Sequence, residues 1–241
     1  MRVDIWSDYV CPFCYIGKRR FEMALNQFPH RDQVQVVYRS FQLDPNTPRD
    51  VEGDMHQVLA DKYGMSREKA KAMNEQVAEQ ARGVGLDYHF DTMLPTNTRD
   101  AHRLTHYAKQ HGKMSEMTER LLHAYFTESL HIGDHPTLAK LAAEVGLNAD
   151  EATAMLSGDE YAVNARQDQE EAARLGVSGV PFFVFNNKYA VSGAQSSESF
   201  AQVLNQVWEE EQAAPVLKMV QDATDSASDD GCSDGSCSVP K

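Results

Sequence analysis

Residues 2–14 read RVDIWSDYVCPFC, and this stretch indicates both the fold and the chemistry. Its first part, residues 2–6, is a short strand-like run, and Cys11 follows after a loop of polar and aromatic residues. From Cys14 to Phe28 apolar residues recur at helical spacing, so Cys11 stands where a helix begins. A helix N-terminus favours a thiolate, because unpaired N–H groups and the helix dipole stabilise negative charge. We therefore expect Cys11 to be the nucleophile and Cys14, one turn later, to be the resolving thiol.

The four cysteines occupy only the two ends of the 241-residue chain. Cys232 and Cys237 lie near the finish, and residues 15–231 contain no cysteine. A disulfide framework stabilises small exported domains that lack a core, so in this long chain the thiols are interpreted as chemistry. The spacing Cys-x-x-Cys is also half of a zinc site, but Pro12 and the strand-then-helix setting favour redox exchange. We expect neither a metal nor another cofactor.

The charge balance limits the classes of partner. The chain has 23 Lys and Arg against 36 Asp and Glu, a formal net charge of -13, so a surface that follows the phosphates of a nucleic acid is excluded. No apolar run approaches the roughly 20 residues that span a bilayer, and the N-terminus lacks the apolar stretch of a signal peptide. We therefore expect a cytoplasmic protein that binds neither nucleic acid nor membrane.

The rest of the chain alternates between strand and helix patterns. Residues 34–41 (VQVVYRSF) are β-branched and aromatic and predict a second strand. From about residue 54 to 175 the pattern is helical almost throughout. Residues 180–185 (VPFFVF) and 189–191 then predict a hairpin that turns at Asn186-Asn187, because asparagine tolerates positive φ. A last helix is predicted over residues 196–212.

This order predicts an α/β protein with a thioredoxin-like fold that a large all-helical domain interrupts. Residues 1–50 and 176–213 would form the discontinuous thioredoxin-like domain, and residues 51–175 the helical insert. Residues 214–241 are rich in Ser, Asp and Gly, so we expect a flexible C-terminal tail that carries the C-x-x-x-x-C pair.

Four motifs add a family resemblance. The CPFC of residues 11–14 and the SGVPFFVF of residues 178–185 resemble the DsbA-like branch of the thioredoxin superfamily, and more narrowly its FrnE-like members. RSFQLDP at 39–45 and NTRDAHRL at 97–104 extend the resemblance over roughly residues 1–212. The resemblance implies that the Val180-Pro181 bond is cis, faces the cysteine pair and presents the backbone of Val180 to a substrate strand.

The resemblance also implies a second redox pair in the tail, because some FrnE-like proteins carry a C-terminal C-x-x-x-x-C. Four small polar residues separate Cys232 from Cys237, so the loop between them can close into a disulfide. The tail thiols would exchange with Cys11 and Cys14 or pass electrons onward. A scavenging surface thiol pair and opportunistic metal binding are the alternatives.

Two aspartates are candidates for the proton carrier that thioredoxin-like sites often keep beneath the resolving cysteine. Asp4 lies in an otherwise apolar strand run, where burial would let it accept the proton of Cys14, and we favour it. Asp8, three residues before Cys11, is the competitor, and either carboxylate could simply bond a loop. His102 and His106 have the i, i+4 spacing of helical metal ligands but no accompanying glutamate motif, so polar packing is expected of them.

The predicted function is a cytoplasmic dithiol-disulfide oxidoreductase or isomerase of protein disulfides. Its partners would be client proteins with thiols or disulfides, and glutathione or a thioredoxin-type protein would recycle it. Phe13 offers no hydrogen bond or charge to the thiolate, which predicts a potential less oxidising than that of DsbA. Kappa-class glutathione transferases and 2-hydroxychromene-2-carboxylate isomerases share the architecture but use serine as the nucleophile. A zinc-binding interaction module that uses all four cysteines is the other alternative.

Overall fold

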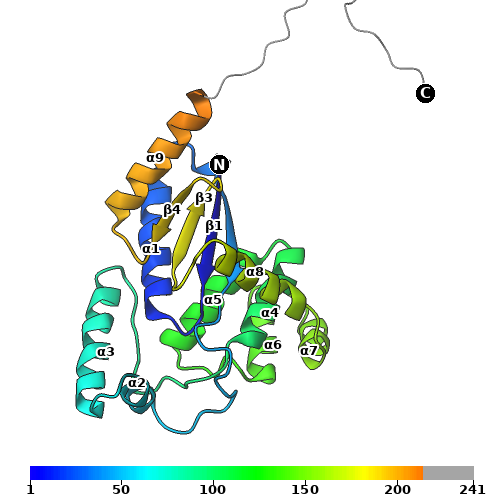
Figure 1. The fold of residues 1–241 in the computed structure, drawn as a ribbon. Helices are drawn as coiled ribbons and strands as arrows, with labels where there is room; N and C mark the ends of the chain where they lie inside the picture. The colour runs from blue at the N-terminus through cyan, green and yellow to red at the C-terminus, as the bar shows by residue number, and fades with distance from the viewer. Residues whose placement is uncertain (214–241) are drawn as a thin grey trace, which may run out of the picture.

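The strands form where apolar, β-branched and aromatic residues gather, and together they make one sheet (Figure 1). The computed structural model describes residues 1–213. The sheet order is β2-β1-β3-β4. β1 (Arg2–Ser7) pairs in parallel with β2 (Gln35–Ser40) and antiparallel with β3 (Phe182–Phe185), which pairs with β4 (Tyr189–Ser192). The strand that leads into the cysteine motif is therefore held from both sides.

Alternation along β1 gives the sheet two different faces. Val3 and Ile5 pack with α1 (Pro12–Gln27) and α9 (Ser197–Ala213) in one apolar cluster. Trp6 belongs to a smaller cluster with Ala172 of α8 (Ala162–Arg174). The two sides of β1 thus bury different partners. This difference separates Asp4, which lies on the α8 side of β1, from the cysteines of α1 on the other side.

The predicted hairpin is confirmed. Asn186 and Asn187 have φ values of 48° and 53°, and the Lys188 N–H donates to the Phe185 carbonyl at 2.9 Å. Positive φ at both central residues is the conformation that joins twisted strands through a two-residue loop, and asparagine adopts it at little cost.

Helices fill the chain between β2 and β3, as the sequence predicts. Glycines in the left-handed conformation follow several of them, at positions 112, 146 and 176, where the sequence places stops. Ser66 accepts a hydrogen bond from the Lys69 N–H at 3.2 Å and caps the helix that it precedes. The helices are α2 (Met55–Tyr63), α3 (Arg67–Arg82), α4 (Arg99–Gln110), α5 (Met114–Phe126), α6 (His135–Glu144), α7 (Ala149–Ser157) and α8, and a 3-10 turn spans Arg31–Gln33.

The helical region shares its core with the start of the chain. Tyr9, Tyr15 and Ile16 lie in the same apolar cluster as the buried residues of α4 and α5. In Figure 1 the first turn of α1 lies at the end of the sheet that faces α2 and α5, whereas α9 ends at the opposite end. Within residues 1–213 no helix has the length and apolarity needed to cross a membrane.

Candidate functional site

The cysteine pair opens α1, where Cys11 is the N-cap residue and Pro12 the first helical residue. Proline suits this position because its fixed φ matches the helix and its missing N–H needs no partner. The Cys14 N–H donates to the Cys11 carbonyl at 3.0 Å, which holds the two residues within one turn. Both thiols are free and buried, with exposed fractions of 5% for Cys11 and 2% for Cys14.

The two sulfur atoms have different surroundings. Cys11 Sγ lies 3.5 Å from the Val180 carbonyl oxygen, whereas Cys14 Sγ accepts the Asp8 backbone N–H at 3.5 Å. Burial, together with the neighbouring Cys11 sulfur, raises the pKa of Cys14 well above its usual value. Cys14 therefore keeps its proton, and Cys11 is the thiol placed at the helix N-terminus with a carbonyl beside it.

The Val180-Pro181 bond is cis, as the family resemblance implies. Its position depends on Gly17 in α1, because a Cβ atom there would lie 2.9 Å from Pro181 Cγ. The Gly193 N–H donates to the Pro181 carbonyl at 2.8 Å and fixes the loop from the other side. The structure thus brings the loop at residues 180–181 against Cys11, although 169 residues separate Cys11 from Val180.

The two candidate proton carriers lie in different places. Asp4 is on the α8 side of β1, and its carboxylate accepts hydrogen bonds from Arg2 Nε at 2.8 Å and Arg39 Nε at 2.7 Å. Asp8, past the end of β1, is 1% exposed, and its own N–H points at Cys14 Sγ. The sequence favours Asp4, because it lies in an otherwise apolar strand run. Alternation along a strand does not say which face of the strand meets α1. The structure places the backbone of Asp8 beside Cys14 and the carboxylate of Asp4 between two arginines.

His102 is a neighbour of the site whose part the sequence does not predict. Its Nε2 lies 3.3 Å from Asp8 Oδ1, and the Leu43 N–H donates to Asp8 Oδ2 at 2.8 Å. His106, one turn further along α4, contacts Ser40 and Asp168 instead. The two histidines thus take separate polar partners, and residues 1–213 hold no group of three ligating side chains that fits a metal ion.

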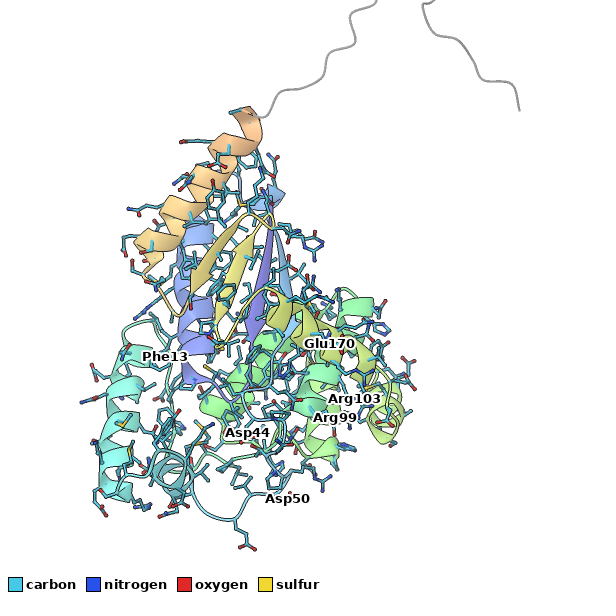
Figure 2. The ribbon with its side chains drawn as sticks, in the orientation of Figure 1. Phe13, Asp44, Asp50, Arg99, Arg103 and Glu170 are labelled. Carbon is cyan, nitrogen blue, oxygen red and sulfur yellow. The ribbon has the colours of Figure 1, made fainter. Side chains whose placement is uncertain are left out.

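Two aromatic residues complete the surroundings of the motif. Tyr88 donates its hydroxyl to the Pro12 carbonyl at 2.8 Å across 76 residues of sequence, a contact that no local pattern indicates. Phe13 is 39% exposed at the start of α1, on the side nearer α3 in Figure 2. The motif therefore presents at least one aromatic side chain to solvent. Cys232 and Cys237 lie outside the described residues.

Comparison with known proteins agrees with this geometry. The family model for the DSBA-like thioredoxin domain matches residues 2–205. The chain belongs to the DsbA-like thioredoxin family. A crystal structure of a probable DsbA oxidoreductase from Streptomyces coelicolor is 41% identical over the full length of both chains, with a TM-score of 0.84. Membership of this family supports thiol-disulfide oxidoreductase chemistry.

More distant structures share the fold. A 2-hydroxychromene-2-carboxylate isomerase is 14% identical over 90% of this chain and 100% of its own, with a TM-score of 0.68. The cytosolic disulfide reductase DsbM from Pseudomonas aeruginosa, solved with GSH, is 16% identical over 88% and 98%, with a TM-score of 0.59. At these identities the likeness shows the fold alone.

Proposed function

We propose that the protein is a dithiol-disulfide oxidoreductase that exchanges protein disulfides through Cys11 and Cys14. The observation that carries this proposal is the asymmetry of the pair. Cys11 caps a helix beside the Val180 carbonyl, while Cys14 is buried behind it with a raised pKa. One thiol is placed to attack, and the other keeps its proton until it is needed.

The exchange has two steps in the reducing direction. The Cys11 thiolate attacks one sulfur of a client disulfide, and the other client sulfur leaves and takes up a proton. Cys14 then loses its proton and attacks Cys11 Sγ, so the second client thiolate leaves and a Cys11–Cys14 disulfide remains. Two electrons pass to the client, and the reverse sequence oxidises a client dithiol.

The loop at residues 180–181 is proposed to hold the client backbone. The Val180 carbonyl already lies 3.5 Å from Cys11 Sγ. A client segment that offers an N–H to this carbonyl would pair with the loop as an added strand, with its cysteine beside Cys11. The helical insert at residues 51–175 would cover one side of the exchanging pair and select clients.

Asp8 is proposed to be the base that receives the Cys14 proton. It is buried, next to Cys14 through its backbone N–H, and its carboxylate is oriented by Leu43 and His102. The transfer between the Cys14 thiol and the Asp8 carboxylate is proposed to run through a water molecule. Asp4 is bound by two arginines and is assigned no part in the transfer.

An insulin-reduction assay with matched cysteine variants tests the proposal. Cys11→Ser should abolish turnover, and Cys14→Ser should stop it after one covalent adduct. Metal analysis of the purified protein separates the zinc-binding alternative, because stoichiometric zinc would support that alternative and overturn the redox reading. Full activity in Cys11→Ser would also overturn the proposed redox function.

The tail pair is proposed as a second redox centre of the FrnE type. Cys232 follows the last residue of α9 by 19 positions, and an extended segment of that length spans at most about 65 Å. The α9 terminus lies at the opposite end of the sheet from Cys11, and such a span permits exchange within one chain (Figure 1). A redox titration with mapped disulfides should show a crosslink between Cys11 and a tail cysteine at intermediate potential. Independent titration of the two pairs would contradict this exchange.

Glutathione or a thioredoxin-type protein is proposed to recycle the site, and the cytoplasm is the proposed compartment. The neighbouring DsbM structure, described as a cytosolic reductase with GSH, supports both choices. Oxidised protein incubated with reduced glutathione should return to the dithiol form through a glutathione adduct on Cys11. No such adduct is expected in Cys11→Ser.

A further inference from the structure

A cavity of about 220 Å³ lies directly beside the cysteine motif. Asp8, Val10 and Pro12, which flank Cys11 in the chain, form one of its walls. The segment after β2, helix α2 and the residues before α4 form the others, and Figure 2 places Asp44 of this lining between α2 and α4. A molecule in the cavity therefore contacts the two residues on either side of Cys11 in the chain, Val10 and Pro12.

The walls of the cavity are mostly apolar. Two of the apolar lining residues, Leu43 and Tyr63, are exposed. The other apolar residues of these walls are Val51, Met55, Val58, Leu59 and Pro95. Leu43 is 42% exposed and Tyr63 is 60% exposed, which is unusual for side chains of this size. An apolar cavity of about 150 Å³ accommodates benzene, so the larger volume here can hold a substituted aromatic ring.

The lining of the cavity also includes a residue whose buried polar group has no partner among the described residues. Tyr125, from α5, is fully buried and lines the cavity, and its hydroxyl has no hydrogen-bond partner within residues 1–213. Burial and the charge of Asp8 raise the pKa of Tyr125, so its hydroxyl stays protonated as a donor. A buried hydroxyl without a partner is destabilising, and a ligand oxygen that accepts its hydrogen bond would remove that penalty.

We propose that this cavity receives the phenol ring of a tyrosine that neighbours the exchanging cysteine of the client. The inference rests on the proposed function. Val180 on one side of Cys11 would hold the client backbone, so the side chain next to the client cysteine can reach the wall formed by Val10 and Pro12. The ring fills the apolar volume, and its hydroxyl oxygen accepts the hydrogen bond of Tyr125. Leucine or phenylalanine would leave Tyr125 unpaired.

Short peptide disulfides test the proposal with the full-length reduced protein. Each substrate is a symmetric dimer of a peptide with one cysteine, and the residue before or after that cysteine is alanine, phenylalanine or tyrosine. Cys11 attacks the peptide disulfide, one peptide leaves as its thiol, and Cys14 releases the second. The second-order rate of peptide thiol release is measured by acid quenching and chromatography.

The expected order is tyrosine, phenylalanine, alanine, in at least one of the two series. Burial of the ring should make the phenylalanine peptide about 10-fold faster than the alanine peptide. The hydrogen bond to Tyr125 should add a further factor of about 2 to 10 for tyrosine. Equal rates for the three peptides in both series would overturn the inference alone. If none of the peptides reacts, including the alanine peptides, both the inference and the proposed function fail.

Two variants separate the ring from the hydroxyl. Val58→Trp fills the cavity from α2 and should bring the ratio of the tyrosine to the alanine rate close to 1. Its control is Val163→Trp on the exposed face of α8, which should keep the wild-type ratio. Tyr125→Phe should remove the advantage of tyrosine over phenylalanine and keep that of phenylalanine over alanine.

Tyr107→Phe is the control for Tyr125→Phe, because its hydroxyl is bonded to Glu151 away from the cavity. This control should leave all peptide ratios unchanged.

A final comparison uses free 4-methylphenol, which should slow the tyrosine peptide by competition and leave the alanine peptide unaffected. If the free phenol binds at the cavity but the tyrosine peptides have no advantage, the site takes a small molecule and the inference is wrong.

Discussion

Two buried pairs of aspartate and histidine lie one helical turn apart along α4, and they have different surroundings. His106 lies 3.1 Å from Asp168, which also accepts hydrogen bonds from Arg39 at 2.7 Å and from the Ser40 N–H at 3.0 Å. His102 lies 3.3 Å from Asp8, whose other carboxylate oxygen accepts only the Leu43 N–H within the described residues. The carboxylate of Asp168 has a guanidinium partner, whereas Asp8 contacts the Cys14 thiol through its backbone N–H.

The difference separates a structural pair from the pair that we propose to be reactive. Burial alone would raise the pKa of Asp168, but His106, Ser40 and Arg39 together hold it below its usual value. That carboxylate therefore stays charged and links α8 to the sheet. Asp8 has no such cation among residues 1–213, and it lies against Cys14.

The largest expected effect is on stability, at the structural pair. Asp168→Ala should lower the free energy of unfolding by about 3 kcal/mol, because it leaves the buried Ser40 N–H and His106 without their partner and removes one of the two buried carboxylates that Arg39 contacts. Urea denaturation at pH 7 measures this loss. Glu171→Gln is the control, since Glu171 is a more exposed partner of the same arginine and should contribute less than about 1 kcal/mol. Equal losses in both variants would show that burial does not decide the value of these pairs.

The next effect is on exchange, at the reactive pair. Asp8→Asn should slow the step in which Cys14 resolves the mixed disulfide by about 100-fold at neutral pH, because it removes the base. The free energy of unfolding should stay the same or rise. Rapid-quench measurement of client release across pH tests the rate. Asp4→Asn is the control and should leave the pH dependence of turnover unchanged. If Asp4→Asn changed the pH dependence and Asp8→Asn did not, Asp4 would be the proton carrier.

The smallest effect is the pH dependence of stability that comes from a third carboxylate, Glu119. Like Asp168, this carboxylate lies beside cationic side chains. Burial would raise the pKa of Glu119, but Arg19 and Lys18 of α1 lower it from 4.5 to about 2. Because the folded pKa is below the unfolded value, its stabilisation is complete above about pH 4.5 and is lost as the pH falls toward 2. Wild-type stability should therefore drop between about pH 4.5 and pH 2.

Glu119→Gln should flatten that part of the stability curve. Glu22→Gln, which removes another carboxylate that contacts Lys18 and Arg19, is the control and should keep the wild-type drop. An unchanged drop in Glu119→Gln would show that other groups dominate the acid transition.

Much of the fold could be predicted from the sequence, because its signals are local. The apolar run of residues 2–6, the Asn186-Asn187 turn and the helix stops at glycine each depend on a few neighbouring residues. The cysteine motif is equally local. The cis bond at Val180-Pro181 came from the family resemblance, since most X-Pro bonds are trans.

The rest of the site depends on which face of an element meets which partner. Asp4 and Asp8 look alike in the sequence, and only the packing of α8 against β1 shows that Asp4 is bound by arginines. The contacts of His102 with Asp8 and of Tyr88 with Pro12 join residues 94 and 76 positions apart. No periodic pattern encodes such pairs, because they arise when the helical region packs on the start of α1.

The most direct test of the central claim is to trap the mixed disulfide. Full-length Cys14→Ser is incubated with a disulfide-linked client, and the adduct is located by intact mass and peptide mapping. The account predicts that the client attaches first to Cys11, that any later release of the client leaves Cys11 bonded to a tail cysteine, and that no adduct forms when Cys11→Ser is added. A client attached first to Cys232 or Cys237, or a Cys11 that forms neither bond, would contradict the assignment of Cys11 as the attacking thiol.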